Sequence, residues 1–253
     1  MREAVEQLLL PAECLLCRAL LSFRDSARLV CEVCRHRWRP VRPPWCARCG
    51  QPEPLFCRCR LCAEWPATFG QSRSAVWLDG GARDAVHALK YGGLPRIATD
   101  LAAAMVGLDV PGLDSGLLVP VPLGRARLRN RGYNQSERLA RALGRRWGRP
   151  VVDLLVRTRD TAAQTALTPE ARRANVAGAF ELRIGDCGLR IDGRKFQSAI
   201  RNPKSAMERP LILVDDVFTT GATLAEAARA LDQAGARTVS AVTFGRAVVP
   251  DFT

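Results

Sequence analysis

Leu-Ile-Leu-Val-Asp-Asp-Val-Phe-Thr-Thr-Gly-Ala-Thr, which spans residues 211–223, is the most informative stretch of this sequence. Its first four residues are apolar and predict a fully buried strand, with two adjacent acids at its carboxyl end. A turn of small residues follows, and the pattern over 223–234 predicts a helix that Gly235 ends. A buried strand that leads through such a turn into a helix is typical of an α/β domain.

The segments on either side extend this pattern. The sequence predicts further strands over 71–78, 117–121 and 238–244, and further helices over 83–90, 95–106 and 134–147. Strands that alternate with helices indicate a mainly parallel sheet with flanking helices, so we expect one α/β domain over 67–253. Residues 183–209 hold seven Lys or Arg, three acids and little apolar periodicity, and we predict a long loop or hairpin insertion there.

The turn after the two acids has the chemistry of a phosphate site. The backbone N–H groups of 219–223 lie at a predicted helix N-terminus, where the helix dipole favours an anion, and Gly221 allows a close approach. The two acids are expected where open α/β sheets bind ligands, and they can accept hydrogen bonds from sugar hydroxyls. We therefore predict a site for a phosphorylated sugar rather than ordinary helix capping. Its residues are Asp215, Asp216, Thr219, Thr220, Gly221, Ala222 and Thr223.

Basic residues gather in 123–149, which contain nine Arg and the single acid Glu137. Every second residue from Arg127 to Arg131 is Arg, so in an extended segment these side chains would project to one side, where guanidinium groups match phosphate oxygens. This strip predicts either a phosphate site or a track for single-stranded nucleic acid with Tyr133 as a stacking ring; a solvated Arg-rich face is the third interpretation. The candidate nucleic-acid residues are Arg125, Arg127, Arg129, Arg138, Arg141 and Arg145.

The ten cysteines are unevenly spread, because nine of them precede residue 63. Paired Cys-x-x-Cys units predict one or two tetrahedral thiolate sites for structural Zn²⁺ in a small domain over 1–66, which needs such staples to fold. Sequential pairing is preferred, a cross-braced arrangement is the alternative, and Cys57 and His36 are substitute ligands. The predicted ligands are Cys14, Cys17, Cys31, Cys34, Cys46, Cys49, Cys59 and Cys62.

The composition limits the classes of protein. A formal net charge of +13 over 253 residues indicates polyanionic partners, either nucleic acid or phosphorylated metabolites. No apolar run approaches the roughly 20 residues of a membrane-spanning helix, and the N-terminal residues lack the features of a signal peptide. We therefore expect a cytoplasmic protein that is not inserted in a membrane.

Further motifs follow one another along the chain. They are Ala-Leu-Lys-Tyr-Gly-Gly (88–93), Val-Pro-Val-Pro (119–122), Arg-Gly-Tyr-Asn-Gln (131–135), Arg157 and Thr158 with Gln164, and Arg-Ala-Asn-Val-Ala-Gly-Ala-Phe (173–180). The stretch 211–223 resembles the phosphoribosyl-pyrophosphate (PRPP) motif of type I phosphoribosyltransferases. With the cysteine-rich head, the ordered set resembles the ComF family of competence-associated proteins over nearly the whole chain. The insertion over 183–209 departs from that family, in which the strand before the PRPP motif follows more closely.

The resemblance implies a type I phosphoribosyltransferase-like fold and a site for PRPP with Mg²⁺. Lys90 and Arg131 would lie at the pyrophosphate, and Asp215 and Asp216 would hold the ribose and serve as catalytic residues; a solvated partner of its helix dipole is the alternative role of Lys90. The resemblance also implies handling of single-stranded DNA in natural transformation, beside a helicase-like partner and a membrane channel. Two other functions stay open, namely a phosphoribosyltransferase of nucleotide salvage and a regulator that senses PRPP.

Overall fold

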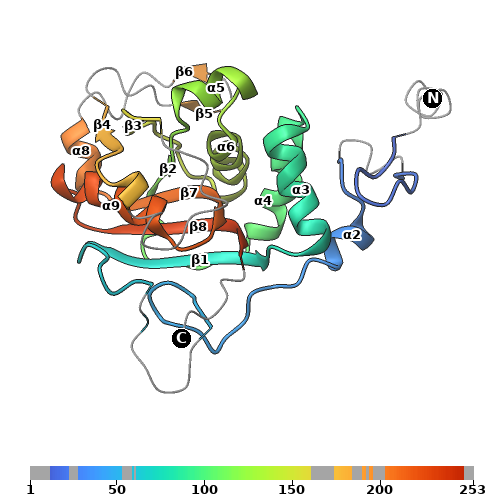
Figure 1. Cartoon of the computed structure of the whole chain (residues 1–253), viewed down its shortest axis with the longest axis horizontal. Helices are drawn as coiled ribbons and strands as arrows, with labels where there is room; N and C mark the ends of the chain where they lie inside the picture. Colours follow the sequence, from blue (N-terminus) through green and yellow to red (C-terminus); the bar gives the residue numbers. More distant parts are fainter. Residues whose placement is uncertain are drawn as a thin grey trace.

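The computed structural model describes residues 12–22, 28–52, 59, 61–160, 174–183, 190–191, 194–195 and 203–247. A four-stranded parallel sheet lies at its centre, in the order β1 (Phe69–Trp77), β8 (Val239–Arg246), β7 (Leu211–Phe218) and β2 (Leu117–Pro120) (Figure 1). The predicted α/β, type I phosphoribosyltransferase-like fold class is confirmed.

The inner strand β7 is buried on both faces of the sheet. Ile212 and Val214 belong to one hydrophobic core, whereas Leu211 and Leu213 belong to the other. Successive side chains of a strand point to opposite faces, so a continuous apolar run is what a sheet covered on both sides requires.

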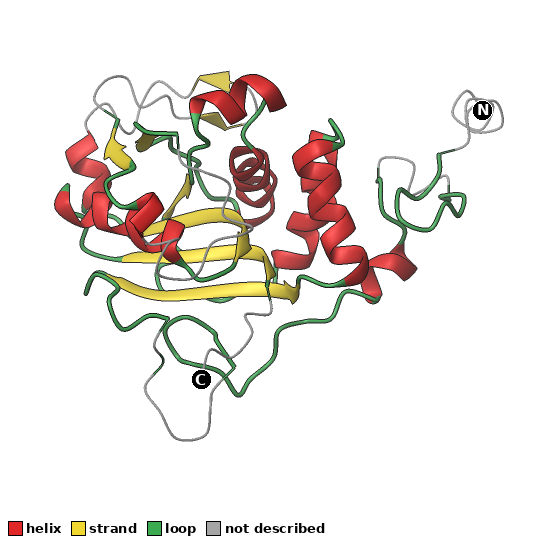
Figure 2. Ribbon diagram, viewed as in Figure 1, coloured by secondary structure: helices red, strands yellow, loops and turns green. Residues whose placement is uncertain are grey.

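Helices cover both faces (Figure 2). One core contains residues of α3 (Gly80–Tyr91), the 3₁₀ helix η2 (Pro95–Ile97), α4 (Ala98–Met105) and α6 (Gln135–Trp147). The other contains residues of α8 (Pro203–Met207), α9 (Ala222–Gln233) and a small antiparallel sheet of β3 (Leu155–Arg157) and β4 (Phe180–Leu182). The remaining elements are α2 (Glu32–His36), α5 (Arg125–Arg131), β5 (Arg190–Ile191) and β6 (Arg194–Lys195).

The predicted elements of the α/β domain are found near their predicted positions, with two differences that affect the site. The strand predicted over 211–214 continues to Phe218, because β8 keeps pairing with β7 after β2 has ended at Pro120. The two acids therefore lie inside a strand, although beyond the end of its neighbour β2. Residues 125–131 form the helix α5, so the expectation of an extended segment there is wrong.

Only part of the predicted insertion over 183–209 is described. The strands β5 and β6 pair in antiparallel fashion, as in the hairpin that was one of the two expectations, and α8 is a helix that was not predicted. The remainder lies outside the described residues, as do Gln164 and Arg173. Across the part of the chain that the structure describes, no helix has the length and apolar character needed to cross a bilayer.

Candidate functional site

A cavity of about 730 Å³ opens at the carboxyl ends of the parallel strands. Residues of β7, of α3, of α5 and of the first turns of α6 and α9 line it. Among its lining residues are two acids, Asp215 and Asp216, and a larger set of basic side chains, Arg83, Lys90, Arg127, Arg131 and Arg157. Open α/β sheets bind ligands at this position, and the excess of positive charge suits a polyanion.

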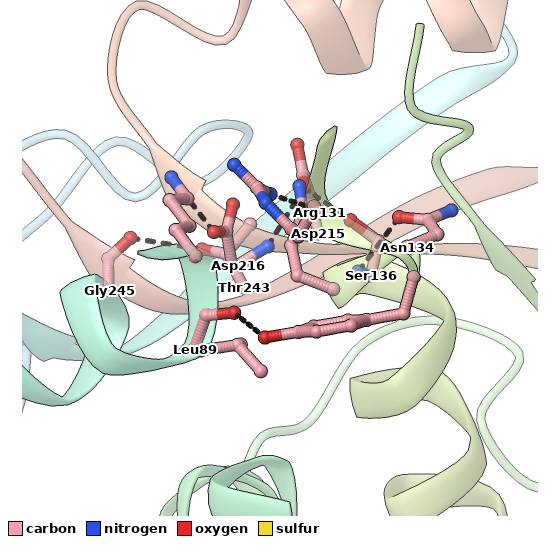
Figure 3. Close-up of polar contacts among 11 residues, drawn as sticks. Leu89, Arg131, Asn134, Ser136, Asp215, Asp216, Thr243 and Gly245 are labelled. Carbon is pink, nitrogen blue, oxygen red and sulfur yellow. Dashed lines mark hydrogen bonds and ion pairs between the residues drawn. The ribbon is translucent and has the colours of Figure 1, made fainter. Parts of the chain in front are cut away.

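Asp215 and Asp216 face this cavity with different partners. The Ser136 hydroxyl donates a hydrogen bond to Asp215 Oδ1 at 2.7 Å, and the two residues face one another in Figure 3. Lys90 Nζ forms an ion pair with Asp216 Oδ2 at 2.8 Å. The Asp216 backbone N–H also donates to Asp215 Oδ1, at 2.9 Å. Both acids are buried, with 9% of Asp215 and 3% of Asp216 exposed, so each depends on these contacts for its charge.

The surroundings of the pair shift two pKa values. Burial raises the pKa of Asp215 to about 7, the neighbouring Asp216 carboxylate adds to the effect, and Ser136 and Lys90 offset only part of it. Burial by itself would lower the pKa of Lys90, but the charge of Asp216, the hydrogen bond to it and the charge of Asp215 together outweigh burial and raise it. The cavity therefore holds a permanent cation next to a carboxyl group that titrates near neutral pH, a combination typical of functional sites.

The turn between β7 and α9 forms one end of the cavity. Thr219, Gly221 and Thr223 line it, whereas Thr220 and Ala222 are buried and are not among its lining residues. Gly221 is the N-cap of α9 with a φ of 77°, in the left-handed region that favours glycine. The first turn of α9 thus begins at the cavity, where its dipole favours an anion.

The segment between α5 and α6 ties several elements together around the acid pair. The Tyr133 hydroxyl donates to the Leu89 carbonyl of α3 at 2.5 Å, and Asn134 Nδ2 donates to the Val121 carbonyl at 3.0 Å (Figure 3). The Asn134 side chain also caps α6, because it accepts a hydrogen bond from the Ser136 backbone N–H at 3.1 Å. These contacts hold the serine beside the acid pair.

The structure separates the Arg residues that the sequence grouped as a strip. Arg127 and Arg131 are four residues apart on α5 and line the cavity, whereas Arg125 and Arg129 are exposed and do not. The Arg131 guanidinium contacts Gln135 Oε1 and lies 5.3 Å from the centre of the Tyr91 ring.

The other three predicted nucleic-acid residues, Arg138, Arg141 and Arg145, lie on α6 and are not among the cavity-lining residues. Arg141 forms an ion pair with Glu137 of the same helix.

The two tyrosines differ in the solvent exposure of their rings. Tyr133, predicted as the stacking ring, is partly buried, its hydroxyl is bound to α3, and the Arg138 guanidinium lies 5.9 Å from its ring centre. Tyr91 is 70% exposed and lines the cavity. Sequence reasoning gave Tyr91 no role beyond its motif, and the structure offers it as the more accessible ring.

The eight predicted metal ligands form two clusters, in the sequential arrangement preferred from the sequence. The first cluster is Cys14, Cys17, Cys31 and Cys34; the second cluster is Cys46, Cys49, Cys59 and Cys62. Within each cluster all sulfur atoms lie within 4.8 Å of one another. His36 binds the Glu32 carbonyl through Nδ1 instead, and Cys57 lies outside the described residues.

The sulfur geometry fits zinc. The Sγ atoms of Cys17 and Cys31 are 3.7 Å apart, those of Cys46 and Cys62 are 3.6 Å apart, and those of Cys49 and Cys59 are 3.4 Å apart. Four thiolates at about 2.3 Å from a tetrahedral Zn²⁺ would lie about 3.8 Å from one another. All-cysteine, fully coordinated sites are structural, so each cluster fits one structural Zn²⁺.

Comparisons with known proteins agree with this architecture. A double zinc ribbon domain family matches residues 5–65. The chain is 30% identical over 247 residues to the DNA utilization protein YhgH of Escherichia coli O6:H1, covering 92% of this chain and 96% of that protein. The chain belongs to the ComF family. It is also 31% identical over 248 residues to YhgH of Salmonella typhimurium, an alignment that covers 92% of this chain and 96% of that protein. The competence protein ComFC of Bacillus subtilis is 27% identical over 252 residues, and the alignment covers 92% of this chain and 94% of that protein.

Several cavity residues of this ComF-family chain, Ser136 and Arg157 among them, were given no role from the sequence. Ser136 lies two residues after the helix cap Asn134, and nothing in its local pattern indicates that it reaches Asp215. Arg157 is part of a motif, but only the structure brings it to the cavity, where it is buried with its guanidinium 5.2 Å from the Phe180 ring centre.

Proposed function

We propose that this chain binds PRPP, or a related 5-phosphorylated ribose, in the cavity, and acts in the uptake or use of single-stranded DNA. The observation that carries the proposal is the buried pair Asp215 and Asp216, which faces the same cavity as the Gly221 turn and several basic side chains. A ribose phosphate presents the complementary groups, namely hydroxyl donors for the acids and an anion for the turn.

In this proposal each part of the ligand meets one part of the cavity. The 5′-phosphate lies at the N-terminus of α9, with the Thr219 and Thr223 hydroxyls as donors and Thr220 and Ala222 contributing backbone groups only. Asp215 and Asp216 accept hydrogen bonds from the ribose hydroxyls. Lys90, Arg127 and Arg131 supply the cations that a pyrophosphate group needs, and Mg²⁺ bound with the ligand would neutralise part of the remaining charge.

Calorimetric titration with PRPP and Mg²⁺ tests the binding site. Thr223→Val should weaken binding roughly ten- to a hundredfold, because a hydrogen bond to a charged group contributes about 1.5–3 kcal/mol. Thr99→Val, at an exposed position of α4, is the matched control and should bind as the wild type does. Absence of binding by the wild-type chain at millimolar PRPP would contradict the proposal.

The DNA part of the proposal rests on the relatives and on the charge of the chain. YhgH is named a DNA utilization protein and ComFC a competence protein, and this chain carries a formal net charge of +13. Tyr91 at the cavity combines an open ring with Arg131 at 5.3 Å and the His87 ring at 4.9 Å. Aromatic rings next to cations bind single strands of nucleic acid, so we assign the contact to the α3–α5 side of the cavity rather than to α6. A helicase-like partner and a membrane channel stay predictions.

Fluorescence anisotropy with labelled single-stranded DNA tests this assignment. Tyr91→Ala should weaken binding by about 1–3 kcal/mol, the usual contribution of one stacked base, while Tyr91→Trp should retain it. Arg145→Gln removes a charge from the exposed face of α6 and should have a much smaller effect. If instead Arg145→Gln weakens binding and Tyr91→Ala does not, the strand binds on α6.

One observation favours phosphoribosyl transfer as a second candidate function. A carboxyl group with a pKa of about 7, such as that of Asp215, can accept a proton from an attacking nucleophile at neutral pH. We expect the release of pyrophosphate from PRPP, with DNA or free nucleobases as acceptors, to increase as the pH rises through 7 in the wild type. Asp215→Asn should lack that increase. PRPP that binds without any release would favour the sensing role instead.

A further inference from the structure

The two cysteine clusters pack into different hydrophobic cores. Cys14 and Cys34 of the first cluster belong to the core of α3, α4 and α6. Cys46, Cys49 and Cys62 of the second cluster belong to the core that contains Phe218 and residues of α9. Figure 1 shows the segment that carries the first cluster beside α3, and the segment that carries the second cluster below β1. Only the second cluster therefore shares a core with Phe218 and Leu224, which flank the turn on either side.

A buried arginine connects the second cluster to this turn. Arg246 ends β8 and is 1% exposed. Its Nη1 donates to the Cys49 carbonyl at 2.8 Å, and its Nη2 donates to Gln51 Oε1 at 2.7 Å. The same guanidinium lies 4.3 Å from the ring centre of Phe218, the residue directly before Thr219. Arg246 thus contacts the cysteine loop on one side and the start of the turn on the other.

The second cluster also balances the charge of Arg246. Within the described ranges no carboxylate forms an ion pair with this residue. Four thiolates around one Zn²⁺ carry a net charge of about −2, and a buried cation is stable only beside such a counter-charge.

Trp65 makes a second connection. Its backbone N–H donates to the Cys62 carbonyl at 3.3 Å, and its ring is stacked on Phe69 with the centroids 4.1 Å apart. A Cβ on Gly221 would lie 3.2 Å from Trp65 Cζ2 and 2.7 Å from Phe218 Cζ, so the turn rests directly against both rings. Both rings are held by contacts to residues of the second cluster or to the arginine bound to it.

We propose that the second cluster, through Arg246 and Trp65, holds the turn at 219–221 in its phosphate-binding shape. The affinity of the cavity for a phosphorylated ribose then depends on the metal in the second cluster and not on the metal in the first. The inference rests on the proposed function, because it concerns the same turn. Arg246 is a positioning residue, since it contacts Phe218 and is not among the residues that line the cavity.

Variants of Arg246 test the connection without removing a metal ligand. Arg246→Met keeps much of the side-chain volume but lacks the charge and the hydrogen bonds. We expect it to retain two Zn²⁺ per chain, to exchange the amide hydrogens of 219–223 about tenfold faster and to bind PRPP about tenfold more weakly, as for a typical coupling between sites. Arg246→Lys should restore part of both properties. Wild-type exchange and affinity in Arg246→Met would overturn the proposal.

A matched pair of ligand variants compares the two clusters. Cys59→Ser and Cys17→Ser each replace one of the more accessible cysteines of the second and the first cluster. Each variant should lose one Zn²⁺ per chain, but only Cys59→Ser should speed exchange at 219–223 and weaken PRPP binding. Equal effects of the two changes would overturn the proposal, even if Arg246→Met does not fold.

Hydrogen exchange separates this inference from the proposed function. If the wild-type chain does not bind PRPP, the proposed function fails, while a difference in exchange between Cys59→Ser and Cys17→Ser still supports the connection. If the wild-type chain binds PRPP and both variants bind it equally well, the proposed function stands and the inference fails.

Discussion

Two adjacent aspartates in β7 acquire different properties because successive side chains of a strand point in different directions. Asp216 meets the ammonium group of Lys90, which supplies a full opposite charge. Asp215 meets the neutral hydroxyl of Ser136 and lies next to a second carboxylate. Sequence alone presents the pair as two equivalent acids, whereas their surroundings make one an ion-pair partner and the other a titrating group.

The raised pKa of Asp215 predicts a stability that depends on pH. Its folded-state pKa of about 7 exceeds the ordinary value of 3.8, so this group's contribution to stability is complete below about pH 4 and is lost as the pH rises through 7. Asp215→Asn cannot ionise, and should raise the free energy of unfolding above that of the wild type by a few kcal/mol at pH 8 and by about 1 kcal/mol less at pH 6. Urea unfolding at the two pH values measures this difference.

The exposed Asp109 provides the control, because Asp109→Asn should change stability equally at both pH values. If Asp215→Asn does not raise the free energy of unfolding, or raises it equally at both pH values, that result would contradict the assigned pKa. The stabilised variant should nevertheless lose PRPP affinity, because an uncharged amide is a weaker acceptor for ribose hydroxyls.

Gly221 and Gly235 allow strain and close contact to be measured separately. Both have a positive φ, 77° and 92°, but a Cβ on Gly221 would meet Phe218 and Trp65, whereas none of the described atoms lies within 4 Å of a Cβ on Gly235. Gly235→Ala should therefore cost only the roughly 1–2 kcal/mol of a left-handed residue. Gly221→Ala should cost more, and it alone should weaken PRPP binding. Equal losses of unfolding free energy in chemical denaturation would show that the turn tolerates the methyl group.

At the scale of elements, α5 decides which Arg side chains reach the cavity. Its alternating Arg residues suggest a strand, but Gly124 precedes the segment and Gly132 ends it in a left-handed conformation, as at the end of a helix. Arg, Ala and Leu are also good helix formers. A helix brings Arg127 and Arg131 together at a spacing of four, and turns Arg129 away from them.

This geometry predicts unequal effects of two double variants that remove the same charge. Arg127→Gln with Arg131→Gln should weaken PRPP binding about tenfold or more, and reduce the salt dependence of DNA binding by about two phosphate contacts. Arg125→Gln with Arg129→Gln should leave PRPP affinity near the wild-type value. Calorimetry and salt-dependent anisotropy measure both effects. Equal losses of PRPP affinity in the two double variants would indicate that general electrostatic attraction, and not the cavity, governs binding.

At the scale of the whole molecule, the cysteine clusters are parts of the two hydrophobic cores and not appendages to them. Each core combines cysteines of one cluster with apolar residues from the sheet and its helices. The division into domains at residue 66 stays a prediction. We expect the segments before and after residue 66 to unfold together, because contacts in both cores join them.

Zinc removal should therefore destabilise the whole chain. A chelator should lower the Tm by about 10 °C or more, because each zinc site contributes several kcal/mol to folding and 1 kcal/mol corresponds to about 2–4 °C in a chain of this size. The transition should recover when zinc is restored before aggregation. A calorimetric scan in which the sheet melts at the same temperature with and without zinc would contradict this coupling.

Local pattern alone settled the features whose physics acts over a few residues. The apolar run of β7 predicts burial, the glycine in the turn predicts a close approach of the backbone, and the Cys-x-x-Cys pairs predict thiolate sites. Lys90, Ser136 and Arg246 meet their partners only in the folded chain, because these partners are distant in sequence and the contacts depend on how whole helices and strands pack. Such contacts result from the sum of many burial and hydrogen-bond energies across both cores, and no local spacing encodes that sum.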